Sequence, residues 1–153
     1  MTDAVVIRQA VEGDLPGVLA LYAQPGLDDG RTLSPEQAAL HYQRFREYPD
    51  YRLFVAELHG KIVGTFALLI MDNLAHLGAP SGVVEDVAVA RAHQGRGIGR
   101  RMMEAALEEC RESRCYKMML SSNLKREAAH AFYESLDFEK HGYSFKVVFE
   151  QKT

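Results

Sequence analysis

The sequence lacks long apolar runs and contains little cysteine. Its most apolar stretch, residues 62–71, spans ten residues, whereas a helix needs about 20 apolar residues to cross a bilayer. The two cysteines, Cys110 and Cys115, can form at most one disulfide and are typical of reduced thiols inside a cell. Residues 1–8 show no charged start followed by an apolar core, so no export signal is evident. We therefore expect a cytoplasmic protein without a membrane partner.

An excess of positive charge is also lacking. The 18 lysines and arginines are outnumbered by 21 aspartates and glutamates, for a net charge of −3. Nucleic-acid-binding domains are usually basic, so we expect no nucleic-acid partner. The six histidines form neither a His-Glu-x-x-His motif nor a cysteine-paired zinc pattern. No metal is therefore expected.

What is present is typical of a globular protein. Of 153 residues, 47% are apolar and 25% charged. A chain of this length can bury roughly 70% of its unfolded surface. We expect one domain spanning residues 1–153.

Apolar periodicity and turn residues predict about seven strands and about four helices. The clearest strands are expected at residues 5–8, 51–58, 62–71, 83–89, 116–120 and 143–149. Helices are expected after Asp14, after Ser34, at 98–114 and at 127–136. The strand, long helix and strand between residues 83 and 120 form a βαβ crossover, so these two strands should be parallel. With antiparallel strands at the ends of the sheet, the fold class is mixed α/β.

The most informative segment joins a predicted strand to the long helix. Gly95, Gly97 and Gly99 alternate there, and residues 87–103 contain four arginines and no acid. Glycine lets the backbone approach a ligand closely, and a helix start presents unpaired N–H groups with partial positive charge. The pattern favours binding of a phosphate. The alternative is that the glycines only shape the turn and the arginines only face solvent. The spacing matches neither the dinucleotide-binding pattern nor the P-loop.

Residues 94–99, Gln-Gly-Arg-Gly-Ile-Gly, resemble the Q/R-x-x-G-x-G/A motif of the GNAT superfamily of acetyl-CoA-dependent N-acetyltransferases. The order of expected elements resembles that fold along nearly the whole chain, and residues 131–134 look like the second cofactor motif. Residues 84–89 and 115–117 resemble glucosamine phosphate N-acetyltransferases. Residues 121–123 together with 129–133 resemble aminoalkylphosphonate N-acetyltransferases.

The resemblance implies a GNAT-type fold. Its sheet is mostly antiparallel, with a central pair of parallel strands that splay apart to receive the pantetheine arm of acetyl-CoA. Acetyl-CoA is the expected co-substrate, and a homodimer through the final strands is the expected assembly. The family usually has Gly-Phe after the short helix, where this chain has Asp137 and Phe138. Because Asp tolerates positive φ better than most residues, we expect the left-handed turn to be kept.

The resemblance also implies roles for individual residues. Backbone N–H groups of residues 94–100, the glycine segment, hold the pyrophosphate. The preceding strand pairs with the pantetheine, and the N–H of Val89 polarises the thioester carbonyl. Asn123 matches the family residue that bonds the pantetheine. The cofactor-binding residues expected are Val87, Ala88, Val89, Gln94, Gly95, Arg96, Gly97, Ile98, Gly99, Arg100 and Asn123.

The reaction requires a base and an acid. An alkyl amine holds its proton up to about pH 10, so a carboxylate must accept it, directly or through water. Glu85 is the first candidate and Asp86 the second; they face opposite sides of a regular strand unless a bulge intervenes. Tyr133, by its motif position, is the expected acid for the leaving thiolate. The alternatives are solvated strand acids and a core tyrosine.

The acceptor is expected to be a primary amine on a small molecule, with an amino sugar or an aminophosphonate as candidates. Asn73 and His76, just before the strand at 83–89, are candidate substrate-binding residues, and plain exposed loop residues are the alternative. Three other functions compete: a protein or peptide acetyltransferase, an acyl-CoA sensor without turnover, and a tRNA-directed toxin. The retained Tyr133 argues against the sensor, and the net charge of −3 against the toxin.

Overall fold

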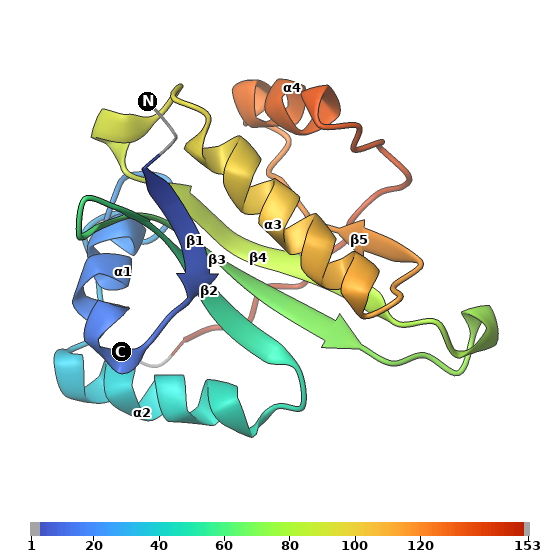
Figure 1. Ribbon diagram of the computed structural model, residues 1–153, viewed down its shortest axis with the longest axis horizontal. Coiled ribbons are helices and arrows are strands. Elements are labelled where there is room, and N and C mark those ends of the chain that lie inside the picture. The colour runs from blue at the N-terminus through green and yellow to red at the C-terminus, as the bar shows by residue number, and fades with distance from the viewer. Residues whose placement is uncertain (1–3, 152–153) are drawn as a thin grey trace. The chain divides into compact units, whose positions relative to one another are not determined.

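The computed structural model describes residues 4–151, which form two compact units divided between Leu120 and Ser121. The first unit contains five strands and three of the four α-helices (Figure 1). In chain order its elements are β1 (Val5–Gln9), η1 (Glu12–Asp14), α1 (Leu15–Tyr22), α2 (Pro35–Glu47), β2 (Tyr51–Leu58), β3 (Lys61–Met71), η2 (His76–Gly78), β4 (Ser81–Val89), η3 (Arg91–His93), α3 (Ile98–Glu112) and β5 (Lys117–Met119). The second unit contains α4 (Glu127–Ser135). The predicted mixed α/β fold class is confirmed.

The strands form a single sheet in the order β1-β2-β3-β4-β5. The first three pairs are antiparallel, whereas β4 and β5 are parallel, as the βαβ crossover predicted. The described residues form five strands, fewer than the approximate seven expected.

The strand predicted at residues 143–149 is not formed. In the described part of the chain this segment has no ladder partner. Tyr143 is 89% exposed and Phe149 75% exposed. Alternating apolar residues predict a strand only where a neighbouring strand satisfies the backbone, because pairing and burial provide the stability. That partner is missing here, so the prediction was wrong.

Helices cover both faces of the sheet. Alternate residues of a strand point to opposite faces, and in β2 Leu53 packs in the core cluster under α1 and α2, whereas Arg52 forms an ion pair with Glu109 of α3. Gly64 lets α3 approach β3 closely, since a Cβ there would lie 2.6 Å from the sulfur of Met102. The start of α3 is thereby fixed against the sheet.

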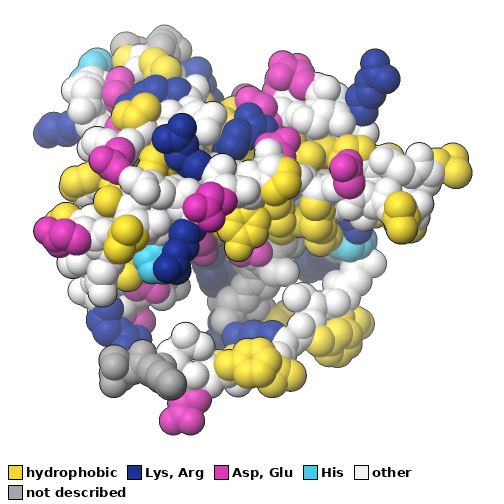
Figure 2. Space-filling model, turned by 90° about the horizontal axis from the view of Figure 1, so that it is seen from below, with side chains coloured by type: hydrophobic (Ala, Val, Ile, Leu, Met, Phe, Trp, Pro, Cys, Tyr) yellow, Lys and Arg dark blue, Asp and Glu magenta, His cyan; other side chains and the backbone are white. Residues whose placement is uncertain are grey.

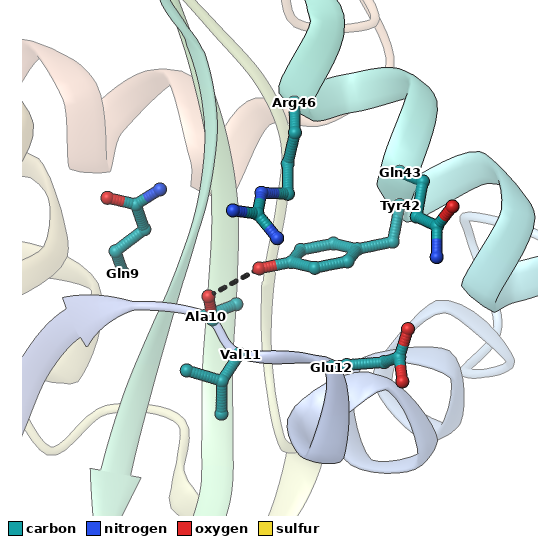
Figure 3. A pocket seen from close by; sticks show the side chains of 7 residues that line it. All are labelled: Gln9, Ala10, Val11, Glu12, Tyr42, Gln43 and Arg46. Atoms are coloured by element: carbon teal, nitrogen blue, oxygen red, sulfur yellow. Dashed lines mark hydrogen bonds between the residues drawn. The ribbon is translucent and has the colours of Figure 1, made fainter.

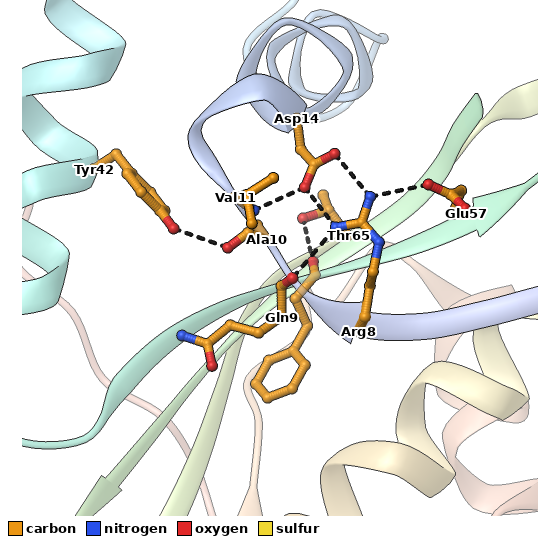
Figure 4. A network of polar contacts seen from close by, with 9 residues as sticks. Arg8, Gln9, Ala10, Val11, Asp14, Tyr42, Glu57 and Thr65 are labelled. Carbon is orange, nitrogen blue, oxygen red and sulfur yellow. Dashed lines mark hydrogen bonds and ion pairs between the residues drawn. The ribbon is translucent and has the colours of Figure 1, made fainter. Parts of the chain in front are cut away.

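A polar network fixes the turn from β1 into α1 (Figure 4). The Arg8 guanidinium donates to both oxygens of Asp14, at 2.7 and 2.9 Å, and to Glu57 at 3.0 Å. Asp14 also accepts the Val11 N–H at 2.8 Å. The hydrogen bond from Arg8 lowers the pKa of Asp14 below its ordinary value. The carboxylate therefore stays charged and holds the turn that precedes α1.

Charges of both signs are interspersed on the face of the molecule that Figure 2 shows. Lysine and arginine side chains alternate there with aspartate and glutamate side chains, so that face carries no field of a single sign. None of the helices between residues 4 and 151 is long and apolar enough to cross a membrane.

Candidate active site

A bulge interrupts β4 at the two candidate base residues. Ala88 pairs with Thr65 and Glu85 pairs with Ala67, so β4 carries one residue more than β3 over this interval. Asp86 has φ of 54°, in the left-handed region. An extra residue in one strand re-aims the neighbouring side chains. The rule that adjacent strand residues face opposite sides therefore does not apply to Glu85 and Asp86.

Both carboxylates act on the pKa of the same tyrosine. Burial raises the pKa of Tyr51, and the carboxylates of Asp86 and then Glu85 raise it further. Burial also raises the pKa of Glu85, with a smaller contribution from the carboxylate of Asp86. The pKa of Asp86 is raised by burial and then by Asp28. Three carboxylates are therefore coupled electrostatically here: Asp28 on the loop after α1, and Glu85 and Asp86 on β4.

A second tyrosine borders this cluster. Burial raises the pKa of Tyr22 well above its ordinary value, and the Asp86 carboxylate raises it further, while a hydrogen bond with Thr65 opposes the shift. The Thr65 hydroxyl in turn donates to the carbonyl of Phe54 at 2.8 Å. Sequence reasoning did not select Tyr22, Tyr51 or Asp28. Their sequence neighbourhood carries no motif, and only the fold brings them to β4.

This cluster can accept a proton. A carboxylate with a raised pKa is a better base near neutral pH than one at its ordinary value. The negative charge also favours the approach of an ammonium group over that of an anion. The cluster suits an acceptor that arrives as a protonated amine and must lose its proton.

The edge of β4 that faces away from β3 is open beyond its first three residues. Within the described residues, β5 pairs with β4 only from Ser81 to Val83. From Val84 to Val89 the same edge has no strand beside it, as expected for a splayed pair. This stretch contains the predicted cofactor-binding residues Val87, Ala88 and Val89.

The glycine segment leads from this edge into α3. Gly95 and Gly97 have φ of 77° and 82°, which L side chains rarely adopt, and Gly97 is the N-cap of α3. The first N–H with a helical partner is that of Arg101, which donates to the carbonyl of Gly97 at 3.2 Å. The N–H groups of Ile98, Gly99 and Arg100 at the start of the helix have no intrahelical partner. They can donate to an anion.

The side chains around the glycine segment also suit an anionic ligand. Among residues 4–151, Arg91 and Arg96 are in no ion pair. The Nδ1 atom of His93 is buried and has no hydrogen-bond partner in the described part of the chain. Gln94 donates from Nε2 to the carbonyl of Val89 at 3.2 Å. The segment therefore offers backbone N–H groups and two cations to an anionic ligand, and binding of the pyrophosphate of acetyl-CoA stays a prediction.

The second unit holds Tyr133 and Asn123. Tyr133 is buried, its ring meets Phe138 edge-on with centroids 5.6 Å apart, and burial raises its pKa. Asp137 has φ of 67°, so the predicted left-handed turn after α4 is confirmed. The Asn123 side-chain oxygen accepts the N–H of Lys125 at 2.9 Å. The catalytic role of Tyr133 and the cofactor contact of Asn123 remain predictions.

The candidate substrate residues Asn73 and His76 lie in the loop between β3 and β4. Asn73 donates from Nδ2 to the carbonyl of Ala79 at 2.8 Å, within the loop itself. The His76 ring stacks on Tyr116 with centroids 4.1 Å apart. Both contacts shape the loop, and a role in substrate binding stays a prediction.

A cavity of about 510 Å³ lies elsewhere, between the end of β1 and α2 (Figure 3). It is lined by Gln9, Ala10, Val11, Glu12, Tyr42, Gln43 and Arg46, and the Tyr42 hydroxyl donates to the carbonyl of Ala10 at 2.8 Å. Neither the β4 carboxylates nor the glycine segment contributes to it, so it is not part of the candidate active site. Among the described residues no three His, Cys, Asp or Glu side chains are grouped to hold a metal ion.

Comparison with known proteins gives consistent relatives. The sequence model described as "Acetyltransferase (GNAT) family" matches residues 19–138. The chain is 33% identical over 144 residues to a glucosamine 6-phosphate N-acetyltransferase of Trypanosoma brucei brucei, covering 92% of this chain and 95% of the relative. It is 31% identical over 101 residues to an aminoalkylphosphonate N-acetyltransferase of Salmonella typhimurium, covering 61% of this chain and 65% of the relative. The solved structure of a Trypanosoma brucei acetyltransferase superposes with a TM-score of 0.83 at 27% identity, covering 95% and 99% of the two chains.

Proposed function

The chain belongs to the acetyltransferase (GNAT) family, and from this membership we propose that it transfers the acetyl group of acetyl-CoA to the primary amine of a small molecule. The observation that carries the proposal is the bulge in β4. It lies at Glu85 and Asp86, whose carboxylates both raise the pKa of Tyr51, on the strand whose open edge leads to the glycine segment. A proton acceptor and a phosphate-binding turn are therefore supplied by one strand and its extension.

Acetyl-CoA supplies the thioester carbonyl that the amine attacks and the thiolate that leaves. The N–H groups of Gly95, Gly97 and Gly99 with their neighbours hold its pyrophosphate, and Arg96 adds a side-chain donor. The edge of β4 at Val87 and Val89 holds the pantetheine, and the Val89 N–H polarises the carbonyl. Asn123 donates to the pantetheine. These assignments follow the family motif residue by residue.

Proton transfer is assigned, following the family motif, to a carboxylate of β4 and to Tyr133. Glu85 or Asp86 takes a proton from the ammonium, directly or through water, and the free amine then attacks the carbonyl carbon. A carbon–nitrogen bond forms and the carbon–sulfur bond breaks. The departing thiolate receives the proton of the Tyr133 hydroxyl, and solvent returns a proton to the tyrosine. Because burial raises the pKa of Tyr133, its hydroxyl keeps the proton it must donate.

The relatives suggest the class of acceptor. The names of the two relatives described above refer to glucosamine 6-phosphate and to aminoalkylphosphonates. Both acceptors join a primary amine to a phosphorus-bearing anion. We propose an acceptor of that class, with its amine directed to the β4 carboxylates and with Asn73 and His76 in the adjoining loop as contacts.

The test measures thiol release from acetyl-CoA with matched pairs of amines. Glucosamine 6-phosphate is compared with glucosamine, and 2-aminoethylphosphonate with ethanolamine, while a lysine peptide represents protein acceptors. Faster turnover of the phosphorus-bearing member of a pair supports the class. Equal rates within both pairs contradict the proposal of a phosphorus-bearing acceptor. Faster turnover of the peptide contradicts the proposal of a small-molecule acceptor.

A thermal shift with acetyl-CoA alone is measured in parallel. Stabilisation without turnover of any amine would favour an acyl-CoA sensor. If acetyl-CoA neither stabilises the protein nor is consumed, the proposed function is wrong.

We also propose that the protein is a homodimer. The segment 143–149 leaves apolar side chains of Tyr143, Phe145 and Phe149 exposed in the second unit. Apolar groups clustered in this way on a folded protein usually mark an interaction surface. A second copy of the chain would cover them.

A further inference from the structure

Gln24, which follows α1 in the sequence, binds the end of β4. Its Nε2 donates to the carbonyl of Val89 at 3.2 Å and to the carbonyl of Leu21 at 3.2 Å. Its Oε1 accepts the N–H of Arg91 at 2.8 Å. One side-chain amide therefore connects the end of α1 to two backbone groups that lie 65 and 67 residues further along the chain.

These two backbone groups lie at the end of the open edge of β4 and directly beyond it, at the start of η3. The N–H of Ala90 donates to the carbonyl of Val63 at 2.8 Å, toward β3. Successive peptide groups of an extended strand point to alternate sides, so the Val89 carbonyl and the Arg91 N–H point away from β3. In a parallel ladder one residue of the neighbouring strand would pair with this same combination of groups. The Gln24 amide takes the place of that residue.

The carbonyl of Val89 accepts a second hydrogen bond from the motif residue Gln94, also at 3.2 Å. The open edge is therefore closed at its far end by two glutamine amides, one from the turn after α1 and one from the glycine segment. A strand-like ligand arm can pair along β4 as far as the Val89 N–H, and its next partners are the N–H groups of the segment itself. The closed end of the edge therefore determines which residues of β4 the ligand arm pairs with.

We propose that Gln24 is a positioning residue of the acetyl-CoA site. It holds the turn at Val89–Arg91 before the ligand arrives, so that the glycine segment does not need to be ordered by binding. Preorganisation of this kind improves affinity because the entropy of ordering a loop is already lost in the free protein. This inference rests on the proposed function, because it concerns the same site.

The test compares acetyl-CoA dissociation constants, measured by calorimetric titration, for the wild type, Gln24→Leu and Gln43→Leu. Gln43 is an exposed glutamine of α2 with no hydrogen bond among the described residues, so it is a matched control for the same change. We expect Gln24→Leu to raise the dissociation constant about tenfold, because the two hydrogen bonds that hold the turn at Val89 and Arg91 are lost together. Gln43→Leu should leave it unchanged. The KM of the amine should change less than twofold, because Gln24 contacts the cofactor side of the site.

A second variant, Gln24→Glu, provides a readout that simple loss of stability would not change. A protonated glutamic acid can donate to the Val89 carbonyl and accept from the Arg91 N–H, whereas the carboxylate can only accept. The affinity of Gln24→Glu relative to the wild type at the same pH should therefore recover as the pH falls from 8 toward 5. This comparison also keeps the test decisive if Gln24→Leu fails to fold.

The outcomes separate the two proposals. A wild type that binds acetyl-CoA, with Gln24→Leu binding equally well, overturns the role of Gln24 and leaves the proposed function intact. A ratio for Gln24→Glu that stays constant with pH also overturns the role of Gln24. A wild type that does not bind acetyl-CoA overturns both.

Discussion

At the scale of single residues, Asp86 carries a charge that the fold disfavours. Its pKa is raised by burial and by Asp28, so the charged form is less stable in the folded than in the unfolded chain. A group of this kind contributes stability only below its unfolded pKa, and that contribution is lost as the pH rises through the folded value. Near neutral pH the carboxylate therefore lowers stability, as expected of a group kept for chemistry.

We predict that Asp86→Asn raises the Tm at pH 7 by about 2 °C and lowers turnover. Asparagine tolerates the positive φ of this position as well as aspartate does, so the change isolates the charge. The gain in Tm should shrink as the pH falls toward 4, because the wild-type carboxyl is then protonated. Thermal melts between pH 4 and pH 8 measure it.

Asp14 provides the matched control, because its pKa is lowered by the hydrogen bond from Arg8. Its contribution to stability is present above the unfolded pKa and is lost as the pH falls through the folded value. Asp14→Asn should therefore destabilise the protein by about 2 kcal/mol at pH 7, with a smaller effect in acid. Shifts of the same sign for both variants would contradict the argument.

Tyr133 should act through its hydroxyl alone. Tyr133→Phe keeps the ring against Phe138, so we expect the fold and the acetyl-CoA affinity to be retained. We predict that kcat falls about 100-fold, since general acid catalysis contributes on that order. Steady-state kinetics check this, with Tyr143→Phe, an exposed tyrosine of the same unit, as the control. Equal kcat values for the wild type and Tyr133→Phe would refute the assignment of Tyr133 as the acid.

At the scale of elements, the glycine segment needs glycine at position 95 for its backbone conformation, and not because a side chain would lack room. A Cβ at Gly95 would meet no atom within 4 Å, but the φ of 77° disfavours any L side chain. We predict that Gly95→Ala weakens acetyl-CoA binding about tenfold. An alanine in the left-handed conformation costs about 1 kcal/mol, so the backbone at residue 95 would change conformation and turn its N–H groups away from the ligand.

Gly13→Ala is the control for that change. Gly13 also has open space around it, and its φ is not positive. Its substitution should leave acetyl-CoA binding unchanged. Calorimetric titration of both variants measures the difference, and equal affinities for the two would show that the conformation of Gly95 does not matter for binding.

The sequence predicted the helices and most strands near the site, but not the irregular parts of the sheet. The four α-helices and the strands with a long apolar period were predictable because their patterns are local. The bulge in β4 was not, since a register shift arises from pairing with β3, which sequence periodicity does not contain. The segment 143–149 has the alternation of a strand but no partner in the described chain, so periodicity alone gave the wrong result there.

The candidate site shows the same division. The turn from β4 into α3 was predictable because glycine adopts a positive φ readily, as Gly95 and Gly97 do, whereas its binding of a phosphate stays a prediction. Tyr22, Tyr51 and Asp28 were not predictable, because they come from α1, β2 and a loop and acquire a role only beside β4. Gln24 is of the same kind, since its partners lie 65 and 67 residues away.

At the scale of the whole molecule, the exposed apolar side chains of the segment 143–149 predict a homodimer. Side chains such as Phe145 and Val147 are 91% and 79% exposed, and burying each in a second copy would be favourable by roughly 1.5–3 kcal/mol. We predict a solution mass of twice the 17.2 kDa of one chain, measured by light scattering after size exclusion. Phe145→Glu should shift the protein toward the monomer, because a charge would have to be buried without a partner.

Leu74→Glu is the control for this surface, because Leu74 is a fully exposed leucine in the loop between β3 and β4 of the first unit. It should leave the solution mass of the dimer unchanged if the interface is the segment 143–149. Dissociation by Leu74→Glu instead would move the interface to that loop, and a wild type of single-chain mass would exclude the dimer. If the dimer forms, its acetyl-CoA affinity should stay constant over the concentration range in which it dissociates, since the glycine segment and β4 belong to one unit of a single chain.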